Sequence, residues 1–205
     1  MSALPVLHVI TDDDVLRSAD FLARAARVLD AIGSRGALHI RGHHTSARSL
    51  YDAAVALAPR AAGAGALLVV NDRVDVALAV RAAAVQVGER SFRVDDVRRI
   101  APRLRVGVSV HTADEAVAAS ASGATWITAG HIFDTPSHAG EPSRGLAFVR
   151  QICRVSSVPV IAIGGITPRD VGPVRAAGAY GVAVIRGIWD SPAEAVHAYL
   201  GECDR

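Results

Sequence analysis

Short apolar runs alternate with longer amphipathic stretches along the whole chain. Eight apolar runs end at glycine or polar residues and are predicted to be strands: 6–10, 37–41, 66–70, 84–87, 105–109, 124–130, 158–163 and 180–185. Each is followed by a stretch predicted to be a helix: 15–32, 46–62, 73–81, 94–101, 112–122, 146–155, 168–177 and 192–200. The chain therefore reads as eight repeated strand–helix units.

The predicted strands are apolar throughout, which is typical of a parallel sheet buried on both faces. Eight such units in 205 residues predict an α/β fold, a single (β/α)8 TIM barrel, as one domain over residues 1–205. An open doubly wound sheet is the alternative. Gly164 and Gly165 follow the seventh strand and favour the barrel, because barrels often bind phosphate at loops seven and eight.

Composition limits the classes of partner. The formal net charge is +2 and no long run of Lys or Arg occurs, so we expect neither nucleic acid nor a membrane surface as partner. There is no basic region followed by an apolar run at the N-terminus and no stretch long enough to cross a bilayer, so we expect a cytoplasmic protein. Cys153 and Cys203 lie far apart without metal-ligand spacing and are predicted to be reduced thiols.

Polar residues gather at the carboxyl ends of the predicted strands, where barrel chemistry lies. The candidate substrate-binding residues at these ends are His39, Arg41, Asn71, Ser109, Thr135, Ser137 and His138. The candidate phosphate-binding residues are Gly164, Gly165, Ile185 and Arg186, since glycine lets backbone amides approach an anion and the next helix adds its positive end. A plain strand–helix turn and a solvated arginine are the alternatives.

His131 follows the sixth strand directly and is the candidate catalytic residue. Its imidazole has an unperturbed pKa near neutrality, which suits proton transfer. The alternative is a histidine that caps the strand and bonds a nearby carbonyl. Asp72 and Glu89 could together hold a divalent metal. Asp72 is equally a helix N-cap and Glu89 can pair with neighbouring arginines, so we expect no metal and no cofactor.

Five segments together resemble the family of thiamine phosphate synthase and the TenI proteins. They are Val-Asn-Asp-Arg-Val-Asp-Val-Ala at 70–77, Gly-Val-Ser at 107–109, Gly-His-Ile-Phe-Asp-Thr-Pro at 130–136, Ile-Ala-Ile-Gly-Gly-Ile at 161–166 and Gly-Val-Ala-Val at 181–184. The resemblance covers nearly the whole chain in the same order. It implies a (β/α)8 barrel and a phosphorylated thiazole as substrate.

The family resemblance implies two branches. Synthases join a pyrimidine pyrophosphate to a thiazole phosphate with magnesium and usually carry proline at position 131; the TenI-type branch usually has histidine there. This chain also has Ser91 in place of the usual aspartate, and His43 and His138 in place of two lysines. Arg186 replaces the serine common in synthases. These departures favour a TenI-type thiazole tautomerase, an isomerase in which His131 moves the proton.

The sequence leaves two other functions open. One is a thiamine phosphate synthase, and the other is a non-catalytic regulatory protein that binds a phosphorylated ligand. The sequence also leaves a homodimer open.

Overall fold

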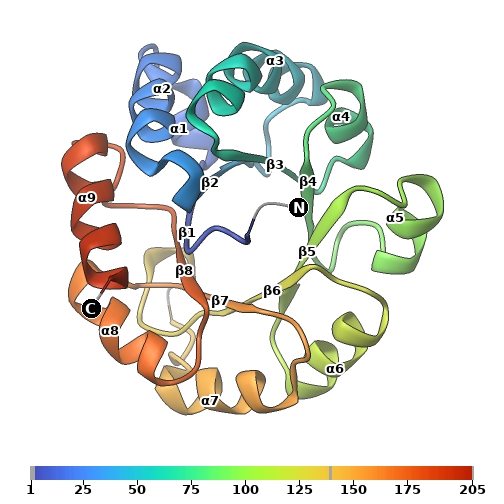
Figure 1. The fold of residues 1–205 in the computed structure, drawn as a ribbon, viewed down its shortest axis with the longest axis vertical. Coiled ribbons are helices and arrows are strands. Elements are labelled where there is room, and N and C mark those ends of the chain that lie inside the picture. The colour runs from blue at the N-terminus through green and yellow to red at the C-terminus, as the bar shows by residue number, and fades with distance from the viewer. Residues whose placement is uncertain (1–2, 139, 205) are drawn as a thin grey trace.

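The strands close into a ring. The computed structural model describes residues 3–138 and 140–204. Eight parallel strands pair in sequence order, and β8 pairs with β1, which closes the barrel. Figure 1 shows the strands as an inner ring with the helices packed around it. The predicted (β/α)8 barrel is confirmed, and the open sheet is excluded because neither β1 nor β8 is an edge.

Each strand is short and each connection carries at least one helix. The strands are β1 (Leu7–Ile10), β2 (Gly36–Ile40), β3 (Leu67–Asn71), β4 (Ala84–Val87), β5 (Arg105–Val110), β6 (Trp126–Gly130), β7 (Val160–Ile163) and β8 (Gly181–Val184). The helices are α1 (Asp13–Arg17), α2 (Phe21–Ile32), α3 (Ala47–Ala64), α4 (Val74–Ala79), α5 (Val94–Ile100), α6 (Ala113–Ala121), α7 (Gly145–Val155), α8 (Pro168–Ala176) and α9 (Pro192–Cys203). Two 3₁₀ turns, η1 (Gly33–Arg35) and η2 (Pro136–His138), complete the set.

Two predicted boundaries differ from the structure. The stretch 15–32 is two helices, because the Ser18 hydroxyl donates to the Val15 carbonyl and ends α1. Asp72, a candidate helix N-cap, does not cap α4: β3 ends at Asn71, the N-cap residue is Arg73 and α4 begins at Val74. The Asp72 N–H donates to the Gln86 carbonyl, so the ladder between β3 and β4 continues one residue past the strand.

The barrel has an apolar layer outside the strands and a separate cluster in its lumen. The outer layer packs the strands against the helices and consists mainly of Val, Leu, Ile and Ala. The lumen cluster contains Ile10, Ala37, Leu67, Val69, Ala84, Trp126, Ile161 and Ala183. Trp126 is fully buried there, opposite Gly107 on β5, where an added Cβ would lie 2.1 Å from the indole. Small residues on the neighbouring strands thus leave room for one large ring.

The N-terminal segment closes the amino end of this lumen. Leu4 packs against the lumen cluster, and its carbonyl accepts a 2.8 Å hydrogen bond from the Tyr180 hydroxyl. The opposite end, at the carboxyl ends of the strands, therefore remains for ligands. Within the described residues, none of the helices has the length and apolar character needed to span a bilayer. Cys153 and Cys203 are free thiols.

Candidate active site

Closure of the barrel brings most of the predicted residues to one end. Arg41 follows β2, Asn71 ends β3, Ser109 lies near the end of β5 and His131 follows β6. Thr135 and Ser137 lie in the loop after β6, Ser137 within η2. The side chain of His138 lies outside the described part of the chain. Among the residues placed so far, all but His39 share one mouth; His39 lies deeper in the lumen and is 1% exposed.

Asp72 and Ser91 form a fixed polar corner between β3 and β4. Asp72 has φ of 63°, in the left-handed region that aspartate tolerates better than most residues. The Ser91 hydroxyl donates to the Asp72 carboxylate at 2.5 Å, and the Gly88 N–H donates to the Ser91 oxygen at 2.9 Å. This chain of bonds holds one carboxylate at the mouth and leaves its second oxygen for other partners.

Arg41 and His43 lie beside that carboxylate and supply hydrogen-bond donors, a charged guanidinium from Arg41 and a neutral imidazole from His43. The Arg41 guanidinium donates to His43 Nε2, so the imidazole accepts and is neutral in this arrangement. Burial lowers the pKa of Arg41, and Asp72 partly opposes that shift through its charge. Burial and the nearby Arg41 charge likewise lower the pKa of His43. Bonds from the Thr11 hydroxyl to the Arg41 carbonyl, at 2.7 Å, and from the Arg41 N–H back to Thr11, at 2.8 Å, fix the backbone here.

A buried polar layer lies across the barrel from β4 to β6. The Gln86 amide donates to the Ser109 hydroxyl at 3.0 Å, and the Thr128 hydroxyl donates to the Gln86 carbonyl oxygen at 3.3 Å. Gln86 and Thr128 are 4% and 6% exposed, so only Ser109 reaches the mouth. Because its partners are fixed below it, Ser109 presents its hydroxyl in a defined direction.

His131 is buried against the turn that follows β7. Ile132 N–H donates to the Ile163 carbonyl and Phe133 N–H to the Gly164 carbonyl, both at 2.9 Å. An added Cβ at Gly164 would lie 2.5 Å from the His131 Cβ, and one at Gly165 would lie 2.4 Å from the Asp134 carbonyl oxygen. Both glycines also have positive φ, of 106° and 64°. Packing against the β6 loop therefore requires these glycines whether or not an anion binds.

The start of α8 is already capped by a carboxylate. Thr167 N–H and its hydroxyl both donate to Asp170, at 2.8 and 2.6 Å. The negative charge of Asp170 opposes an anion placed directly on this helix end. A phosphate in this region would therefore have to rely on the backbone of Gly165, an exposed residue, and on groups from the neighbouring β8 loop.

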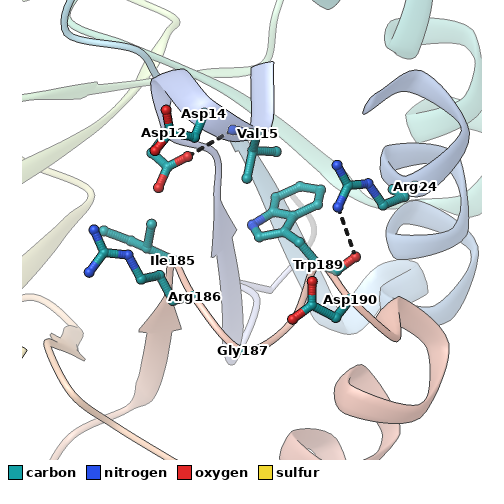
Figure 2. A pocket seen from close by; sticks show the side chains of 9 residues that line it. All are labelled: Asp12, Asp14, Val15, Arg24, Ile185, Arg186, Gly187, Trp189 and Asp190. Atoms are coloured by element: carbon teal, nitrogen blue, oxygen red, sulfur yellow. Dashed lines mark hydrogen bonds between the residues drawn. The ribbon is translucent and has the colours of Figure 1, made fainter. Parts of the chain in front are cut away.

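The β8 loop forms a pocket of about 330 Å³ with the start of α1. Figure 2 shows Trp189 between Arg186 on one side and Arg24 on the other. Ile185 and Arg186 both line the pocket, and Arg186 is exposed, as a ligand-binding cation would need to be. The Trp189 indole N–H is buried and lacks a partner among the described residues.

Some residues of this site were missed or assigned differently from the sequence. Ser91 was counted only as a missing aspartate, although it orients Asp72. Glu89, proposed as a second metal ligand, is exposed, and the described residues contain no group of three potential metal-ligating His, Cys, Asp or Glu side chains. His8 was read as part of an apolar strand, although alternation along β1 would have placed it in the lumen beside β2.

Comparison with known proteins relates the chain to one enzyme family over most of its length. The family model described as "Thiamine monophosphate synthase" matches residues 7–188. A thiamine-phosphate synthase of Roseiflexus castenholzii is 43% identical over 190 residues, covering 91% of this chain and 82% of the relative. One of Salinispora arenicola is 39% identical over 211 residues and covers 98% of both. A solved thiamine phosphate pyrophosphorylase from Pyrococcus furiosus has a TM-score of 0.84 at 30% identity, covering 97% and 95% of the two chains.

These relatives overturn the predicted isomerase. The tautomerase prediction rested on a few positions, above all His131 and Ser91, whereas the similarity to proteins named as synthases extends over nearly the whole chain. The surroundings of His131 give the physical reason for this error. His131 is 5% exposed and lies in the packing between the β6 loop and Gly164, so a histidine here does not by itself indicate proton transfer. The tautomerase and isomerase predictions are wrong.

Proposed function

The chain belongs to the thiamine monophosphate synthase family, and from this membership we propose that it is a thiamine-phosphate synthase. Such a transferase joins hydroxymethylpyrimidine pyrophosphate to a thiazole phosphate. The structural observation that best supports the proposal is the Asp72–Ser91 corner beside Arg41. A fixed carboxylate and a guanidinium lie together at the barrel mouth. The carboxylate could bind the cation that accompanies a pyrophosphate, and the guanidinium could bind the pyrophosphate itself.

The proposed synthase reaction needs neither a proton donor nor an oxidant, because one bond breaks and one bond forms. The carbon–oxygen bond between the pyrimidine methylene and pyrophosphate breaks, and its electron pair leaves with pyrophosphate. The ring nitrogen of the thiazole forms the new carbon–nitrogen bond. The protein therefore needs to hold two substrates in line and to stabilise charge on the leaving group. This chemistry assigns no acid–base role to His131, which forms part of the wall.

The named groups can share that work. Arg41 would donate to the leaving pyrophosphate, and its partial burial strengthens that interaction by removing competing water. Asn71 and Ser109 offer fixed polar atoms to the substrate ring. Thr135 and Ser137, in the loop after β6, would contact the substrates from above.

Magnesium, which the family resemblance implies, fits this site in one particular way. One carboxylate and a serine hydroxyl do not make a complete cage for the ion. However, Mg²⁺ is commonly held by one or two carboxylates together with substrate phosphates. Asp72 would be the protein ligand, and Ser91 would orient it. When bound, the ion would neutralise charge on the pyrophosphate. The prediction that the protein needs no metal thus gives way to a proposal of substrate-assisted metal binding.

The thiazole phosphate would bind at the opposite side of the mouth, near Gly165 and Arg186. Arg186→Ala is expected to raise the KM for thiazole phosphate about three- to tenfold with little change in kcat, because an exposed guanidinium contributes a modest charge-assisted bond. The matched control is Arg150→Ala on α7, which also removes an exposed arginine. Equal KM values for the two variants would count against the phosphate site.

The direct test of the function is an assay with both substrates and Mg²⁺. We expect equimolar thiamine phosphate and pyrophosphate, with turnover abolished by a chelator. If the protein binds thiazole phosphate but forms no thiamine phosphate under these conditions, the synthase proposal fails. The cytoplasmic location stays a prediction, and so does the possible homodimer.

A further inference from the structure

A line of hydrogen-bonding groups runs through the barrel lumen beneath the mouth. His8 Nε2 lies 3.2 Å from the Pro5 carbonyl oxygen, and His8 Nδ1 lies 2.8 Å from His39 Nε2. His39 Nδ1 lies 3.0 Å from Oδ1 of the Asn71 side chain, whose amide oxygen and nitrogen exchange places by a half-turn of the amide group. His8 and His39 are 0% and 1% exposed, so water does not compete for these bonds. The proposed reaction uses neither imidazole directly.

The bottom of this line sets the direction of every bond above it. A backbone carbonyl can only accept, so His8 Nε2 carries its hydrogen and donates to Pro5. In a neutral His8, Nδ1 must then accept, and the donor to it is the Nε2–H of His39. In a neutral His39, Nδ1 must accept in turn. Its partner on Asn71 must therefore be the amide NH₂ group, so the amide must make a half-turn from the orientation in which Oδ1 lies beside His39.

The surroundings favour neutral rings. Burial lowers the pKa of His39 to about 4 and lowers that of His8 well below its usual value. The charged side chains that act on the pair are cations: Arg105 lowers the pKa of His8, and Arg41 lowers that of His39. No carboxylate is among the groups that shift either pKa. A charged pair in this lumen would be unfavourable at neutral pH.

Trp126 holds both rings in place. The His8 and His39 centroids lie 5.6 and 6.4 Å from the indole, and His39 meets it edge-on at 84°. Because the rings fill the lumen between Trp126 and the mouth, they cannot easily rotate to exchange their nitrogen positions. The direction of bonding is therefore a property of the folded barrel.

We propose that the His8–His39 pair is a positioning device that turns the Asn71 amide so that its oxygen faces the mouth. The two oxygen and nitrogen orientations of an asparagine amide have nearly the same shape, and the hydrogen-bond network decides between them. In this orientation Asn71 accepts a hydrogen bond, so the site selects a ligand group that donates one, such as a ring amine or a hydroxyl. The inference deepens the proposed function, on which it relies only for the identity of the ligand.

Ring-nitrogen NMR of the wild-type protein tests the directions without an activity assay. With ¹⁵N-labelled histidine at pH 7, we expect both His8 and His39 as neutral Nε2–H tautomers, assigned by loss of their signals in the single variants. An imidazolium at either position, or an Nδ1–H tautomer at His39, would overturn the proposal. This readout holds even if the protein proves not to be a synthase.

Two replacements of His8 separate positioning from packing. In His8→Gln, one amide can donate to Pro5 and accept from His39, so the direction of bonding is kept. In His8→Phe, the ring volume is kept but the acceptor for His39 is lost, and His39 can then adopt the other tautomer. With thiamine phosphate as the probe, we expect calorimetry to show affinity near wild type for Gln and about tenfold weaker for Phe.

If His8→Gln and His8→Phe both fold and bind thiamine phosphate with equal affinity, the proposed positioning role of the His8–His39 pair is overturned. If thiamine phosphate fails to bind the wild type, the proposed function fails, and the NMR result alone decides the arrangement of the pair. If His8→Phe does not fold, the comparison of His8→Gln with the wild type and the tautomers of the wild type remain as tests. A shifted His39 tautomer in His8→Gln would count against the proposal.

Discussion

Asp72→Asn is expected to lower kcat/KM of the proposed synthase reaction by about 10²-fold or more while the barrel stays folded. Asparagine tolerates the positive φ of this position and can still accept the Ser91 hydrogen bond. The variant therefore removes a charge with little change of shape. That charge is the feature that would hold a cation on the pyrophosphate, and it also interacts with Arg41. Steady-state kinetics at several Mg²⁺ concentrations would measure the effect.

Asp75→Asn is the matched control for this prediction. Asp75 is exposed in the first turn of α4 and pairs with Arg73, so its loss should leave kcat/KM within about twofold of wild type. Ser91→Ala should fall between the two, because Asp72 keeps its charge but loses its fixed orientation. Wild-type activity in Asp72→Asn would remove Asp72 from the proposed site, whatever the behaviour of the other variants.

The fold could be predicted because the signals for it are repeated. Eight apolar runs and eight helical stretches indicate the same architecture, so an error at one boundary does not change the count. The errors are local ones. The split at Ser18 depends on one hydroxyl bonding a carbonyl, and the extension past Asn71 depends on one bond from Asp72 to β4. Single bonds of this kind leave no periodic trace in a sequence.

The site was predictable in position but not in detail. The carboxyl ends of parallel strands must meet at one end of a barrel, so the list of candidates largely follows from topology. Which candidates touch one another depends on register across neighbouring strands. His39 illustrates the limit: it occupies a strand-end position in the sequence, yet its side chain lies below Asn71 rather than beside the ligand. The partner that fixes it, His8, lies 31 positions earlier in the chain.

Function was mispredicted because substitutions were weighed without their surroundings. A histidine at position 131 has the chemistry of a general base, but packing alone can account for its position. A serine at position 91 looks like a lost metal ligand, but here it orients the carboxylate that remains. In each case the residue type indicates what chemistry is available, and the contacts decide whether the site uses it.

Gly107→Ala is expected to lower the free energy of unfolding by about 3 kcal/mol, the upper end of the usual cost of overpacking a core. The new Cβ would lie 2.1 Å from Trp126 Cε2 and 2.2 Å from Gln86 Oε1. Trp126 is fully buried among lumen residues from the other strands, so its ring cannot move aside without disturbing the barrel. A shift of the Trp126 ring or of Gln86 would also disturb the polar layer and the two lumen histidines, His8 and His39. Urea denaturation followed by far-UV circular dichroism would measure the change.

Two comparisons make this last prediction specific. Gly63→Ala, within α3, places a Cβ where no heavy atom lies within 4 Å, and it should raise stability by about 0.5–1 kcal/mol through helix propensity alone. Adding Trp126→Phe to Gly107→Ala removes the ring atoms that clash, so part of the lost stability should return although Trp126→Phe alone is destabilising. That non-additivity is the signature of direct contact between the two positions. Simple addition of the two single effects would show that Gly107 does not make room for the indole.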